Sequence, residues 1–160
     1  MKVKRKVTLD TYDFEIGDVI SFKLTTGEKV RARAVKRTKD GMLFITVDCL
    51  KKEYPMFKNT EGMENNEISY NNSDLRKALN NEILSTFPTE IRDHMVEVYE
   101  TDLLRIPEQG EIFGKYCFEA MKDRHKKIAF RGNKSNEWEW YWLINKAVDT
   151  ASDFVFVNGN

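Results

Sequence analysis

The chain has 160 residues, of which 41% are hydrophobic and 32% charged, a composition typical of a globular protein that excludes wholesale disorder. Basic and acidic residues balance at 26 each, so the formal net charge of zero argues against a general polyanion binder. Only two cysteines occur, which excludes a disulfide framework, and no apolar run is as long as a membrane span.

This length fits a single domain over residues 1–160, in which we distinguish residues 1–50, a connecting loop over 51–72, and residues 73–160. The first residues hold no apolar segment of the kind that signal peptides contain. We therefore expect a cytoplasmic protein whose two thiols stay reduced.

The first fifty residues predict a β-meander. Three strand-like runs cover residues 18–24, 30–35 and 42–50, and glycine-containing turns at 25–28 and 39–41 separate them. In the second run, alanine and valine alternate with arginine, which indicates one buried and one solvated face. The third run is nearly all apolar, so we expect it to be the central strand of the sheet.

Cations are concentrated in this part of the chain. The basic residues are Lys2, Lys4, Arg5 and Lys6 at the start, and Arg31, Arg33, Lys36, Arg37 and Lys39 in and after the second run. We interpret them as a frayed terminus and solvated strand faces, and we do not expect nucleic acid as a partner.

Residues 51–72 predict a loop, because they lack any apolar period and contain Pro55, Gly62 and scattered asparagines. A loop of this length is uncommon inside a compact domain and is often functional. We expect it to belong to a contact surface.

A helix is predicted to start at Ser73. Serine is a favoured N-cap, and Asp74 lies in the first turn, where the helix dipole favours a negative charge. Leu75, Leu79 and Ile83 then follow at a spacing of four residues, which predicts one buried stripe.

The rest of the chain predicts shorter elements. Phe87-Pro88 ends the first helix and starts a second over 89–98, with Ile91 and Met95 facing inward. The remaining predicted elements are short strands at 103–106, 128–130, 138–144 and 154–157, helical turns at 107–113, and a mixed, helix-compatible segment at 116–124.

Six short motifs follow one another from residue 73 onward. They are Ser73-Asp74-Leu75-Arg76 with Leu79-Asn80, Phe87-Pro88, Asp102-Leu103-Leu104 with Glu111-Ile112-Phe113-Gly114, Trp140-Tyr141-Trp142-Leu143, Ala151-Ser152, and Val155-Phe156-Val157-Asn158. In this order they resemble a family of bacterial and phage domains of unknown function. That family's pattern joins an Asp-x-Arg-x-x-Leu-Asn helix to a later tryptophan-rich strand and a strand ending in Val-Asn.

The resemblance implies an α+β, C-type-lectin-like fold: a small twisted sheet, two helices, and long loops on one side. It implies structural roles for Ser73, Asp74, Arg76 and Asn80, with Arg76 tying the helix to a neighbouring loop or carboxylate. Two departures from the pattern are Ile144-Asn145, where Arg-Ser is usual, and an end at Asn160 before the usual closing strand. We expect the second departure to leave a sheet edge open to pairing with another chain.

Residues that bind metals or act as nucleophiles are scattered. His94, His125, Cys49 and Cys117 show no metal-ligand spacing, and we interpret Cys117 and His125 as a buried thiol and a surface imidazole. The calcium-binding motifs of sugar-binding C-type lectins do not occur. We therefore expect no catalytic residues, no metal and no cofactor.

The densest aromatic cluster is the candidate binding site. In an extended strand, Trp138, Trp140 and Trp142 share one face. Either all three pack under the helices, or at least Trp138 is partly exposed beside a polar loop that contains Asn133 and Asn136.

Three functions remain open at this point. The sequence favours a non-catalytic protein-binding module of a phage or other mobile element, with another protein as partner and no membrane association. The alternatives are a calcium-independent carbohydrate-binding module and an enzyme, the latter by analogy of fold alone.

Overall fold

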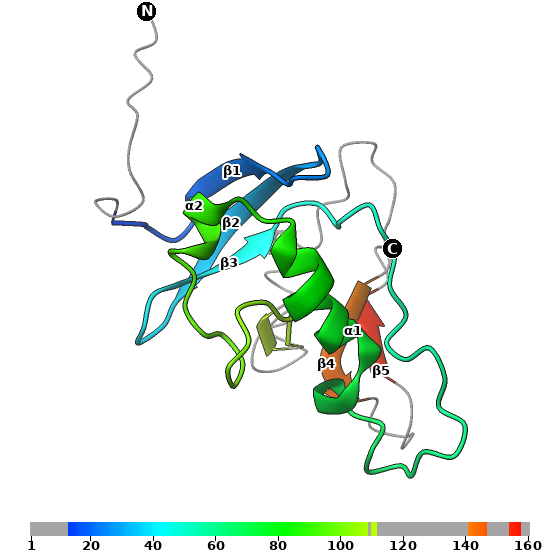
Figure 1. Ribbon diagram of the computed structural model, residues 1–160. Helices are drawn as coiled ribbons and strands as arrows, with labels where there is room; N and C mark the ends of the chain where they lie inside the picture. The colour runs from blue at the N-terminus through cyan, green and yellow to red at the C-terminus, as the bar shows by residue number, and fades with distance from the viewer. Residues whose placement is uncertain (1–12, 109, 112–140, 147–153, 158–160) are drawn as a thin grey trace, which may run out of the picture.

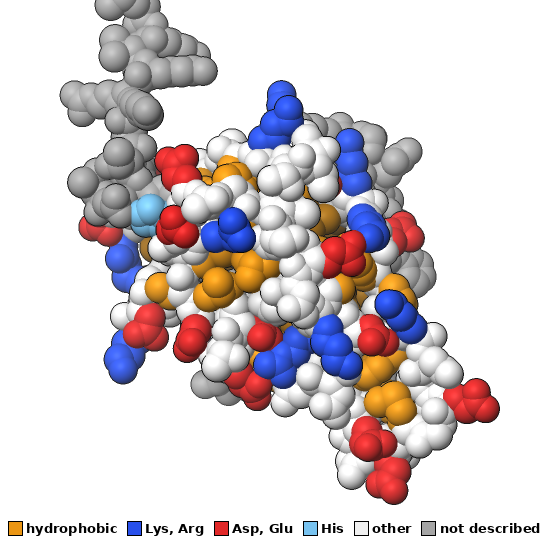
Figure 2. Space-filling model, in the orientation of Figure 1, with side chains coloured by type: hydrophobic (Ala, Val, Ile, Leu, Met, Phe, Trp, Pro, Cys, Tyr) orange, Lys and Arg blue, Asp and Glu red, His pale blue; other side chains and the backbone are white. Residues whose placement is uncertain are grey.

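The protein is a mixed α+β structure, seen in a computed structural model that describes residues 13–108, 110–111, 141–146 and 154–157 (Figure 1). A three-stranded antiparallel sheet packs against the main helix, and a two-stranded pair, β4 and β5, lies beside that helix. No helix among the described ranges is long and apolar enough to cross a membrane. Charged side chains of both signs alternate over the face shown in Figure 2.

The predicted meander is present as β1 (Val19–Lys23), β2 (Lys29–Arg37) and β3 (Met42–Thr46). The turn between β1 and β2 contains Gly27 at φ 90°, a conformation that glycine adopts without steric cost. Along β2, Val30, Ala32 and Ala34 are buried, which confirms the predicted alternation.

The prediction that the third run forms the central strand is wrong. The sheet order is β1-β2-β3, so β2 is central, and β3 ends at Thr46 instead of Leu50. The apolar residues 42–45 of β3 are half-buried, and a ring from outside the sheet contacts one of them. The ring of Phe14 meets the ring of Phe44 edge-on, with centroids 5.0 Å apart.

The main helix consists of α1 (Asp74–Ala78) and a π-helical turn, η3 (Leu79–Ile83), and a short 3-10 turn, η2 (Tyr70–Asn72), precedes it. The predicted N-cap is confirmed, because the hydroxyl of Ser73 accepts a hydrogen bond from the backbone N–H of Arg76 at 3.0 Å. The predicted stripe is also confirmed: Leu75 and Ile83 are buried, and Leu79 packs beside both. The π-helical turn was not predicted.

The second helix, α2 (Thr89–Arg92), is shorter than the predicted 89–98. The helix ends at its C-cap, Asp93. Further along the chain, residues 99–102 form a tight turn, in which Asp102 N–H donates to the carbonyl of Tyr99 at 2.8 Å. Ile91 and Met95 nevertheless pack against the core, as predicted.

The remaining strands are β4 (Tyr141–Lys146) and β5 (Phe154–Val157), which pair antiparallel. The bounds of β5 agree with the prediction, and β4 extends beyond the predicted end at residue 144. The elements predicted at 116–124 and 128–130 lie outside the described residues. The strand predicted at 103–106 is absent from this described segment.

Two groups of buried side chains form the core. One comprises Met56, Ile68, Tyr70 and Leu75, and the other comprises Leu24, Val30, Ile83 and Phe87. Tyr54 and Leu79 pack against both groups and thereby connect them. We expected the 51–72 loop to belong to a contact surface, but it also contributes to the core, because it supplies Met56, Ile68 and Tyr70 to the interior.

Candidate functional site

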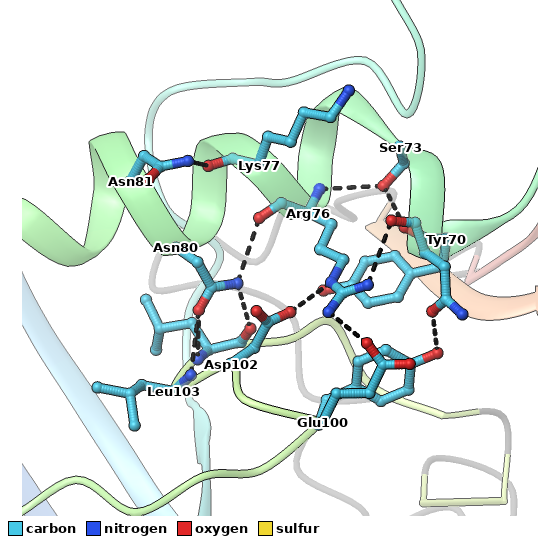
Figure 3. Close-up of polar contacts among 12 residues, drawn as sticks. Tyr70, Ser73, Arg76, Lys77, Asn80, Asn81, Glu100, Asp102 and Leu103 are labelled. Carbon is cyan, nitrogen blue, oxygen red and sulfur yellow. Dashed lines mark hydrogen bonds and ion pairs between the residues drawn. The ribbon is translucent and has the colours of Figure 1, made fainter.

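Arg76 is the centre of a polar network between α1 and the segment that follows α2 (Figure 3). Its Nε donates to the carboxylate of Asp102, one Nη donates to Glu100 at 2.7 Å, and the other donates to the carbonyl of Asn71 at 3.2 Å. The hydrogen bond to Asp102 is the main reason that the pKa of Arg76 lies above its ordinary value. The guanidinium therefore stays charged and links three separate backbone segments.

The turn that Arg76 holds has an unusual backbone. Glu100 has φ 51°, a left-handed conformation that costs free energy for a residue other than glycine. The ring of Tyr99 lies 5.3 Å from the guanidinium carbon of Arg76, within the range of a cation–π contact. These contacts offset part of the cost of the left-handed residue.

Asn80 fixes the next segment. Its side-chain oxygen accepts from the backbone N–H groups of Leu103 and Leu104 at 3.1 and 3.0 Å, and its Nδ2 donates to the carbonyl of Leu104 at 2.9 Å. One amide side chain thus satisfies backbone groups that a strand would pair with a neighbouring strand. This explains why the predicted strand at 103–106 does not form.

Ser73 and Asp74 anchor the beginning of the helix. Ser73 is fully buried, and its hydroxyl donates to the carbonyl of Tyr70 at 2.8 Å while accepting from Arg76 N–H. The carboxylate of Asp74 accepts from the backbone N–H of Lys58 at 2.8 Å, which ties the long loop to the helix. All four motif residues thus bond to backbone or to ion-pair partners.

Arg105 and Glu111 form a buried ion pair that the sequence analysis did not identify. Their side chains expose 9% and 10% of their surfaces. Burial by itself would raise the pKa of Glu111, but hydrogen bonds from Arg105 and from the Glu108 N–H outweigh it and lower the pKa. The spacing of six residues differs from the three- or four-residue spacing of helical ion pairs, so helix periodicity gave no signal for this contact.

Tyr70 carries the hydroxyl that lies among these charges. Burial raises its pKa to about 12, so the phenol keeps its proton at neutral pH and is unsuited to act as a base. It is a core residue whose ring packs edge-on against Tyr99, with centroids 5.3 Å apart.

Of the tryptophan candidates, the structure describes Trp142. It lies in β4 and exposes 36% of its surface, whereas the next residue, Leu143, is fully buried. Trp138, Trp140, Asn133 and Asn136 lie outside the described residues. The structure thus brings the helix motif together and leaves the polar loop of the aromatic site untested.

No group of three or more His, Cys, Asp or Glu side chains within the described ranges is arranged to hold a metal ion. His94 contacts the carbonyl of Glu90 through Nδ1 at 2.7 Å, and Cys49 is an exposed thiol. The acidic residues of the network, Glu100, Asp102 and Glu111, are paired with arginines. The described network therefore acts as a set of structural clamps.

No protein-family model matches the chain, and neither the curated proteins nor the solved structures give a significant match to it.

Proposed function

We propose that this chain is a non-catalytic protein-binding module of a phage or other mobile element, and that it binds through the tryptophan-bearing face of β4. The observation that carries this proposal is the contrast between Trp142, which exposes 36% of its surface, and Leu143, which exposes none. Successive residues of a strand point to opposite faces, so β4 turns its leucine to the core and its tryptophan outward.

A tryptophan that points outward favours a role in binding a partner over a role in packing the core. Tryptophan offers a large rigid surface with a polar N–H, and it is enriched among the residues that dominate binding energy at interfaces. Trp138 and Trp140 have the same parity as Trp142 in the sequence, so a continuous strand would place all three on one face. On this proposal Asn133 and Asn136 lie at its polar rim.

The clamps around α1 support a rigid binding surface. Arg76 and Asn80 fix the 99–104 segment, and Asp74 fixes the long loop at Lys58. A surface that is already ordered pays less conformational entropy on association. The motif residues are engaged with neighbouring backbone and carboxylates, which favours structural roles for them and a non-catalytic function.

The test is affinity after removal of the exposed ring. A partner is captured by cross-linking and mass spectrometry from lysate of the host, and its affinity is measured by calorimetry. Trp142→Ala should weaken binding about thirtyfold, as for a residue that dominates an interface. Val96→Ala is the matched control, because Val96 is also exposed, at 46% of its surface, and lies beside Gly41, which directly precedes β3. Equal affinities of wild type and Trp142→Ala would contradict the proposal.

The same ring also supports the carbohydrate-binding alternative, because aromatic rings stack on sugar faces. Binding on a glycan array that is insensitive to EDTA and lost in Trp142→Ala would favour this alternative. Absence of glycan binding together with a captured protein partner would favour the protein-binding module.

For the finer fold we propose the C-type-lectin-like arrangement. Its support is the mixed α+β content, the antiparallel β4–β5 pair beside the helix, and the long irregular segment between β3 and α1. An experimental structure that includes residues 112–140 tests this arrangement directly.

A further inference from the structure

One face of the β1–β2 hairpin is strongly basic. The side chains at alternate positions on this face are Val19, Ser21 and Lys23 of β1, and Lys29, Arg31 and Arg33 of β2. The register joins them in pairs: Val19 opposite Arg33, Ser21 opposite Arg31, and Lys23 opposite Lys29. The two strands contain no Asp or Glu. The opposite face holds the buried Val30, Ala32 and Ala34, so the basic face is turned away from the core.

Most of this charge is uncompensated by the residues that the structure describes. Arg31 pairs with Asp48 at 2.9 Å and still exposes 40% of its side chain. Lys23, Lys29 and Arg33 form no ion pair with any described residue. The Nε atoms of Arg31 and Arg33 are shielded from water and lack a hydrogen-bond partner within the structure. In Figure 2, Lys and Arg side chains project from the upper margin of the molecule, next to the hairpin of Figure 1.

The spacing of the cations favours a partner in an extended conformation. Alternate residues of a strand are roughly 6.6 Å apart, so Lys29, Arg31 and Arg33 form a row with that repeat. An extended polypeptide with a carboxylate at every second residue has the same repeat. Val19, which exposes 45% of its surface beside Arg33, offers a contact for an apolar side chain of that polypeptide.

We propose that this face of the hairpin docks an extended acidic segment of a partner protein. Guanidinium groups bind carboxylates with strong, charge-assisted hydrogen bonds. The face carries no aromatic ring, whereas single-stranded nucleic acid is bound largely by stacking on such rings. The site is separate from the tryptophan face, so either proposal can fail without the other.

The test uses a fluorescent synthetic peptide of alternating Glu and Val, with binding measured by anisotropy at about 50 mM and about 200 mM salt, since charge contacts weaken with ionic strength. The Lys29→Gln/Arg33→Gln double variant should bind about tenfold more weakly, because two charge-assisted contacts are lost. The matched control is Lys58→Gln/Lys77→Gln, which removes two exposed cations outside the sheet and changes the net charge equally. We expect the control to lose less than about twofold, as for general charge effects.

Three results would overturn the proposal. The first is equal weakening in both double variants, which would indicate a general charge effect. The second is a wild-type chain that does not bind the peptide at the lower salt concentration. The third is tighter binding of single-stranded DNA of equal charge than of the peptide. Thermal melting of each variant confirms that the fold is retained.

Discussion

Arg76 donates a hydrogen bond from Nε to the carboxylate of Asp102, 26 residues away in the sequence, and the two side chains expose only 16% and 14% of their surfaces. Glu100, the second carboxylate partner of Arg76, exposes 55%. The two ion pairs therefore differ in burial although they share one arginine.

This difference predicts an order of stabilities. Asp102→Asn leaves a mostly buried guanidinium short of its main anion and should lower the free energy of unfolding by about 2–4 kcal/mol. Glu100→Gln removes an exposed partner and should cost less than about 1 kcal/mol. Urea denaturation measures both, and a larger loss for Glu100→Gln would mean that Asp102 is not the partner that holds the helix to the turn.

Asn80 should contribute far more to the free energy of unfolding than its neighbour Asn81. Asn80→Ala leaves the N–H groups of Leu103 and Leu104 without their acceptor and should cost about 2–3 kcal/mol. Asn81→Ala removes only an exposed hydrogen bond to the carbonyl of Lys77 and should stay within about 0.5 kcal/mol. Hydrogen exchange gives an independent readout, because the Leu103 and Leu104 amides should exchange faster in Asn80→Ala. Unchanged protection of these amides would contradict the clamp.

Leu79 packs against both groups of core side chains, so Leu79→Ala should lower the free energy of unfolding by about 2–5 kcal/mol. Ser73→Ala removes the helix cap and should cost about 1–2 kcal/mol. Denaturant melts of the two variants compare the losses. The opposite ranking would mean that the contacts of the helix with the core are less important than its cap.

The lowered pKa of Glu111 should make the stability of the fold depend on pH. Its pKa in the folded state is lower than the ordinary 4.5, so its ion pair stabilises the fold above that value. The stabilisation is lost as the pH falls through the lowered pKa, because the unfolded state then binds the proton more readily. Glu111→Gln should therefore flatten the fall in unfolding free energy on acidification below about pH 4.5. Equal slopes for wild type and variant would show that Arg105 does not hold this carboxylate in its charged form.

The local part of the fold could be predicted from the sequence. Three features depend on residues only a few positions apart: the alternation of buried and exposed residues in β2, the glycine turn before it, and the Ser73 cap. Such short-range preferences are visible in a sequence. The order of the strands could not be predicted in the same way. The apolar run of β3 indicated burial on both sides, but it did not show that Phe14 supplies one of the covering rings.

The candidate site was predictable to a smaller extent. Resemblance to a motif selected Arg76 and Asn80, but their partners lie 23 to 26 residues away, and neither the Asp102 pair nor the clamp on Leu103 follows from residue spacing. The Arg105–Glu111 pair had no motif at all. Asn80 also shows why the strand at 103–106 was predicted wrongly, because apolar residues suggested a strand whose backbone groups a side chain already satisfies.

The most direct test of the central claim is hydroxyl-radical footprinting of the chain with and without its captured protein partner, read by mass spectrometry. We expect Trp142 to be oxidised in the free chain and protected in the complex, whereas Leu143 stays unmodified in both. Oxidation of Trp142 at the same rate in the free chain and in the complex would contradict the claim that the tryptophan face of β4 binds the partner.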